Sequence, residues 1–138
     1  MRILPMAFVL YQKYDIHITK SKRAMEDIHK ISGLTHRNPL AQSACGIYLA
    51  IAVRILDGYE LKSAIREGIR EALDWYCSHD RFQCVWGYWE MISDPDDLAS
   101  LPNEIIYSGG YVVQTMETVL WAPMHIGPTT DHPARHAA

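Results

Sequence analysis

The segment from Leu40 to Leu56 constrains the fold most, because it is apolar on nearly every side of a helix. A helix that is apolar almost all round is typical of the centre of a fold. We therefore expect a central helix that begins after Asn38-Pro39, runs to about Asp57 and ends at Gly58. Two adjacent stripes at helical spacing carry this prediction: Leu40, Ala44, Ile47, Ile51 and Ile55, and beside them Ala41, Cys45, Tyr48, Ala52 and Leu56.

The rest of the chain supplies amphipathic helices to surround this segment, and no hydrophobic alternation is long enough for a sheet. With 49% apolar residues in 138, one domain with one core is expected. The predicted fold class is all-α, an orthogonal multi-helix bundle over residues 1–122, followed by an irregular tail at 123–138. The further helices are expected at Leu4–Tyr14, Thr19–Ser32, Glu60–Cys77, Phe82–Ile92 and Tyr111–Trp121, with Gly33 as a left-handed C-terminal residue.

Charge and length argue against two classes of partner. The formal net charge of −3 gives no electrostatic reason to expect nucleic acid or an anionic membrane. The central segment is shorter than the ~20 residues of a membrane span, and Gln42 and Arg54 interrupt it. Because the first residues lack a signal-peptide layout, we expect a cytoplasmic protein.

The three cysteines (Cys45, Cys77 and Cys84) form no C-x-x-C pair and are expected to be buried, inert thiols.

Thr35-His36 lies at the predicted sharp corner between two helices. A histidine there can hydrogen-bond a phosphate or a sugar, and it titrates near neutral pH. The alternative is a histidine that holds the loop through a backbone carbonyl. The residue pattern leaves both interpretations open.

Ser108-Gly109-Gly110-Tyr111 precedes the last predicted helix. Paired glycines let backbone N–H groups approach a ligand closely, and a helix N-terminus favours anions. Tyr111 could stack on a sugar or bond to it. The alternative is an ordinary helix start, capped by Ser108, with Tyr111 used for packing.

Two further groups of residues could bind metal, but a structural role fits each of them better. Asp94, Asp96 and Asp97 read as acids at a helix start, where the helix dipole favours them. The spacing of His132 and His136 would suit a metal only on a rigid helix, which the prolines nearby oppose. We therefore predict no metal ligand in this chain.

Three blocks, in the same order, resemble the ADP-ribosylglycohydrolase family. Met1-Arg2-Ile3-Leu4-Pro5 is similar to the segment that follows a Gly-Asn-Gly loop in that family. The stretch from Leu34 to Ala41 resembles its Thr-His corner. The stretch from Ile106 to Trp121 resembles its Ser-Gly-Tyr-Val-x-x-Thr-Leu-x-x-x-Leu-Trp block, with Gln114 in place of an acid.

The resemblance implies an all-α enzyme that hydrolyses the glycosidic bond between ADP-ribose and a side chain. It also implies a pair of magnesium ions that position water and the ribose hydroxyls. His36, Gly110 and Tyr111 then correspond to positions that line the ADP-ribose cleft.

The family's metal ligands lie in an early Thr-Asp-Asp motif and a late Gly-Asp-x-Asp-Thr motif, and this sequence contains neither. We therefore expect a partial chain with no catalytic residue and no bound magnesium, inactive by itself. The alternative is a non-catalytic helical interaction module. Apolar surface on the central helix predicts self-association or a complementing chain.

Overall fold

The computed structural model describes residues 3–126, and within that range it contains helices and no strand. This confirms the predicted all-α class. The elements are α1 (Leu4–Tyr14), η1 (Ile18–Lys20), α2 (Lys22–Ser32), α3 (Pro39–Leu56), α4 (Leu61–Cys77), η2 (Asp80–Trp89), α5 (Glu90–Ser93), α6 (Pro95–Ser100), η3 (Asn103–Ile105) and α7 (Val112–His125), where η denotes a 3-10 helix.

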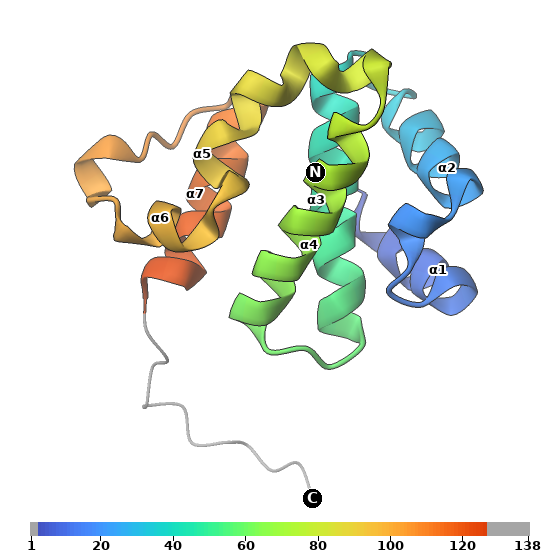
Figure 1. Cartoon of the computed structure of the whole chain (residues 1–138), viewed down its shortest axis with the longest axis horizontal. Coiled ribbons are helices and arrows are strands. Elements are labelled where there is room, and N and C mark those ends of the chain that lie inside the picture. The colour runs from blue at the N-terminus through green and yellow to red at the C-terminus, as the bar shows by residue number, and fades with distance from the viewer. Residues whose placement is uncertain (1–2, 127–138) are drawn as a thin grey trace, which may run out of the picture.

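The apolar helix α3 lies at the centre, as its composition predicts. It packs along α4 and also contacts α1, α2, α7 and η2. Figure 1 shows α1 and α2 on one side of the α3–α4 pair and α5 to α7 on the other, while η2 runs across the ends of α3 and α4. Asn38 caps α3, since its side chain accepts the Ala41 N–H at 2.8 Å, and Gly58 follows the end of α3 with a φ of +92°.

Two glycines allow α3 and α4 to pack closely. A Cβ at Gly68 would lie 2.9 Å from the backbone Cα and N of Ile51, and one at Gly46 would overlap the hydroxyl of Tyr76. A side chain at Gly68 would require the backbone of α3 to move, whereas one at Gly46 would require the Tyr76 side chain to move. The mid-helix Gly68 therefore marks a close helix crossing.

Arg54 is the charged exception on α3. It is only 1% exposed, its Nη1 donates to the Ala50 carbonyl at 2.8 Å, and its Nη2 lies 2.7 Å from Glu71 of α4. Within the described range α3 is the one helix long and apolar enough to cross a membrane, and 67% of it is buried. That burial is what a core helix shows.

Several local expectations were wrong. The helix expected from Thr19 is interrupted at Ser21, whose extended backbone and hydroxyl cap α2 instead. Gly33 has a φ of −65°, so it is not left-handed. The segment from Phe82 forms mainly 3-10 turns, whose three-residue spacing turns Phe82 and Val85 to the core.

The last helix also differs, because α7 continues through Pro123 to His125, although the proline lacks the N–H that would bond to the carbonyl one turn earlier. Its buried residues include Leu120, whereas Val119 is exposed. Among the cysteines, Cys45 is buried as expected, but Cys77 and Cys84 are exposed. The domain boundary at residue 122 stays a prediction, since most of the tail lies outside the described residues.

Candidate functional site

The corner between α2 and α3 presents His36 to solvent. Its backbone N–H donates to the Ser32 carbonyl at 2.9 Å, and the Thr35 hydroxyl donates to the same carbonyl at 3.3 Å. The backbone of the corner is therefore fixed by the end of α2. The His36 side chain extends from this fixed backbone, and its ring makes no hydrogen bond among the described residues.

The segment Ser108–Tyr111, which we call the α7 start, is exposed as well. The side chain of Tyr111 is 50% exposed, and a Cβ at Gly110 would meet no atom within 4 Å. The hydroxyl of Thr115 lies 3.1 Å from the carbonyls of both Gly109 and Tyr111. Ser108 does not cap the helix, whose N-cap residue is Tyr111. The backbone on both sides of Gly110 is thus held by Thr115, and the Tyr111 side chain extending from it is half exposed.

Side chains along one face of α7 bond to backbone carbonyls of the loop that precedes the helix. The hydroxyl of Thr118 donates to the Tyr107 carbonyl at 3.1 Å, and the indole of Trp121 donates to the Leu101 carbonyl at 3.0 Å. The Nδ1 atom of His125 lies 2.8 Å from the Ala99 carbonyl. With Thr115, these residues recur every three or four positions and contact successively earlier carbonyls. Thr115 and Trp121, both part of the family-like block, therefore hold the backbone of the loop in place through hydrogen bonds.

The loop between α2 and α3, which carries His36, and the start of α7 both lie toward the top of Figure 1. No hydrogen bond joins the two places within residues 3–126. Each candidate residue is exposed to solvent, and no other part of the described structure covers either corner. The arrangement is that of two exposed corners rather than one enclosed cleft.

A buried polar cluster, formed by His29, Gln42 and Tyr76, was missed by the sequence analysis. The Nε2 atom of His29 lies 2.9 Å from the Tyr76 hydroxyl, which donates to the Gln42 carbonyl at 3.2 Å. The Gln42 amide donates to the His29 carbonyl at 3.1 Å. Because the hydroxyl proton goes to Gln42, we assign the histidine proton to Nε2.

Burial controls the protonation of this cluster. Burial, together with the charges of Arg81 and His79, lowers the pKa of His29 to about 4. Burial also raises the pKa of Tyr76 well above its usual value. Both groups are therefore neutral near pH 7. Their positions on apolar helix faces, four residues after Met25 and three after Leu73, were the signal available in the sequence.

Two of the three carboxylates singled out in the sequence, those of Asp94 and Asp96, have structural partners. Asp94 caps α6 by accepting the N–H groups of Asp96 and Asp97, and Asp96 accepts from Arg66 at 2.7 Å. Nowhere in residues 3–126 do three His, Cys, Asp or Glu side chains gather to hold a metal ion. The described residues therefore do not fit a pair of magnesium ions, and we derive no step through metal. His132 and His136 lie outside the described residues.

The sequence matches the family model described as ADP-ribosylglycohydrolase over residues 1–136. No curated protein matches the chain. No solved structure matches it either.

Proposed function

The chain belongs to the ADP-ribosylglycohydrolase family, and we propose that its two exposed corners form part of a wall that faces ADP-ribose. His36 is the proposed contact from the α2–α3 corner, and Gly110 and Tyr111 are the proposed contacts from the α7 start. The chemistry to which this wall contributes is hydrolysis of the glycosidic bond between ADP-ribose and a side chain or related acceptor.

The observation that carries this proposal is the geometry of the α7 start. Thr115 fixes the backbone on both sides of Gly110, and the Tyr111 ring is half exposed beside open space. An exposed aromatic ring on a rigid backbone offers a face for stacking without a large loss of conformational entropy on binding.

Hydrolysis by the purified 138-residue chain is not expected. The family's magnesium ions need several oxygen ligands, and the described residues contain no group of three or more His, Cys, Asp or Glu side chains that could hold a metal ion. We assign no catalytic residue to this chain. Release of ADP-ribose from an ADP-ribosylated protein, dependent on added magnesium, would contradict this part of the proposal.

An ADP-ribose titration followed by tryptophan fluorescence tests the binding role. We expect saturable binding that is weakened in Tyr111→Ala and in His36→Ala. Tyr107→Ala and His17→Ala are the matched controls, because both side chains are exposed and lie outside the proposed wall. Absence of binding at millimolar ADP-ribose, or equal losses in the controls, would refute the proposed wall.

A second candidate function, a helical interaction module, is favoured by one surface. Leu4, Phe8 and Val9 lie on α1 and are 46%, 59% and 50% exposed. Such an apolar face suits contact with another protein or with a second copy of the chain. We expect light scattering to show self-association that Phe8→Ser reduces, and a clean monomer would refute this candidate.

A further inference from the structure

Two adjoining hollows lie against α2, η2 and the neighbouring ends of α3 and α4. The first has a volume of about 500 Å³ and the second about 380 Å³. Glu26, His29 and Arg81 line both, so the two hollows adjoin, and we call them together the α2–η2 groove. His36, Gly110 and Tyr111 do not line it, although Gly33, Leu34 and Arg37 of the α2–α3 corner line the first hollow.

The groove is strongly basic in a chain that is acidic overall. Lys30, Arg37 and Arg81 line the first hollow, and Lys20, Lys22 and Arg81 line the second. Glu26 is the one carboxylate that lines either hollow, so five cationic side chains and one anionic one give a formal charge of +4. The whole chain has a net charge of −3. A local excess of this sign attracts anions.

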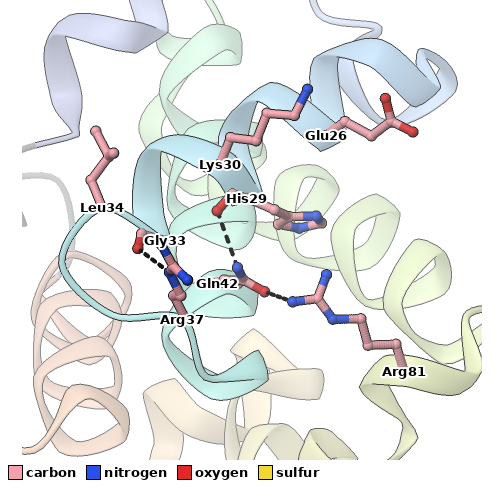
Figure 2. A pocket seen from close by; sticks show the side chains of 8 residues that line it. All are labelled: Glu26, His29, Lys30, Gly33, Leu34, Arg37, Gln42 and Arg81. Atoms are coloured by element: carbon pink, nitrogen blue, oxygen red, sulfur yellow. Dashed lines mark hydrogen bonds between the residues drawn. The ribbon is translucent and has the colours of Figure 1, made fainter.

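Arg81 is held between the two hollows. Its Nη2 donates to the side-chain oxygen of Gln42, and its guanidinium lies 5.2 Å from the centre of the Phe82 ring. Figure 2 shows Gln42 between His29 and Arg81, with its amide nitrogen turned to the His29 carbonyl and its oxygen turned to Arg81. The buried amide thereby fixes the direction of the guanidinium before any ligand binds.

The other arginines in polar contacts between helices have carboxylate partners. Arg54 lies 2.7 Å from Glu71, and Arg66 lies 2.7 Å from Asp96. Arg81 has no carboxylate within 4.0 Å in the part of the chain that the structure describes. Since one of its five N–H groups is used by Gln42, the others are available to an anionic ligand.

We propose that the α2–η2 groove binds a ligand with two linked phosphate groups, one facing each hollow, with Arg81, which lines both hollows, donating to both groups. A planar guanidinium donates to phosphate oxygens in pairs, which suits a fixed arginine at the centre of the site. Lys30 and Arg37 surround the first phosphate group, and Lys20 and Lys22 surround the second. His29 lines both hollows but donates its Nε2–H to Tyr76, so we assign it no hydrogen bond to the ligand.

Inorganic pyrophosphate is the probe, and isothermal titration calorimetry at physiological ionic strength is the measurement. We expect saturable binding that Arg81→Gln weakens about tenfold, the effect of one lost charge-assisted contact. Arg70→Gln is the matched control, because Arg70 is exposed on α4 and lines neither hollow. Lys30→Gln, at an exposed position, should also weaken binding and keeps the test valid if Arg81→Gln unfolds.

The specificity of the groove is tested by two further comparisons. Orthophosphate and sulfate should bind at least tenfold more weakly than pyrophosphate, because each can occupy only one hollow. His36→Ala and Tyr111→Ala should leave pyrophosphate binding unchanged, which separates this inference from the proposed function. No pyrophosphate binding at millimolar concentration, or equal losses in Arg81→Gln and Arg70→Gln, would overturn the proposal.

Discussion

A methyl group added at Gly68 would lie 2.9 Å from the backbone of Ile51, whereas one added at Gly110 would meet no atom within 4 Å. The first glycine belongs to the α3–α4 interior, which also contains Gly46 and the buried polar cluster. The second belongs to the α7 start. The same residue type thus permits close helix packing in one region and leaves an open surface in the other. Stability should therefore depend on the interior, and ligand binding on the exposed corners.

Acidification should produce the largest change, through His29 in the interior. Its folded-state pKa of about 4 lies below the usual 6.5, so the unfolded chain binds the proton more readily. The stabilisation is complete above pH ~6.5 and is lost as the pH falls towards 4, in total on the order of 2–3 kcal/mol after allowance for screening by water.

Urea unfolding at a series of pH values in that window checks this expectation. His29→Gln should flatten the pH dependence, whereas the exposed control His17→Gln should preserve it. Arg81 and His79 are the charged or titratable groups that act on His29, so Arg81→Gln should reduce the effect in part. An unchanged slope in His29→Gln would contradict the assignment.

Gly68→Ala should destabilise the protein by about 2 kcal/mol. The added methyl group forces α3 and α4 apart, which outweighs the roughly 1 kcal/mol of helix propensity that alanine gains. Thermal unfolding measures the change, with Gly110→Ala as the matched variant in the open region. A Gly68→Ala protein as stable as the original would show that the crossing is looser than described.

Tyr76→Phe should cost about 1 kcal/mol of unfolding free energy. The substitution keeps the ring packing but leaves the Gln42 carbonyl and the His29 ring without their shared partner. Tyr88→Phe is the control, because its hydroxyl lies on a side chain that is half exposed. Equal stability of the two variants would imply that the buried hydroxyl is not needed.

Gly110→Ala and Tyr111→Ala should change the free energy of unfolding by no more than about 0.5 kcal/mol, since both positions are exposed and unstrained. They remain the variants that test ligand binding. A loss of stability comparable to that of Gly68→Ala would assign the α7 start a structural role and remove the contrast between the two regions.

The location of most helices could be predicted from local chemistry. Asn38 and Pro39 mark the start of α3, and Gly58 follows its end, because caps and turn residues act over a few neighbours. The interruption at Ser21 was missed, since a serine inside a periodic pattern reads equally well as a surface residue or as a cap.

The candidate residues His36, Gly110 and Tyr111 were selected from their sequence pattern, and the structure leaves all of them exposed. Their role as ligand contacts stays a prediction. The α2–η2 groove was not predicted, because its cationic residues come from α2, η2 and the loops beside them. Separate segments such as these reveal a common patch only after folding.

The sequence by itself determined that α3 is central, because a helix without a polar face is stable only when other helices cover it. It could not determine which polar groups join it in the core. His29 and Tyr76 are 47 residues apart, and Trp89 donates to Ser43 across 46 residues. A buried polar group is stable only with a hydrogen-bond partner, and the tertiary structure alone brings these partners together.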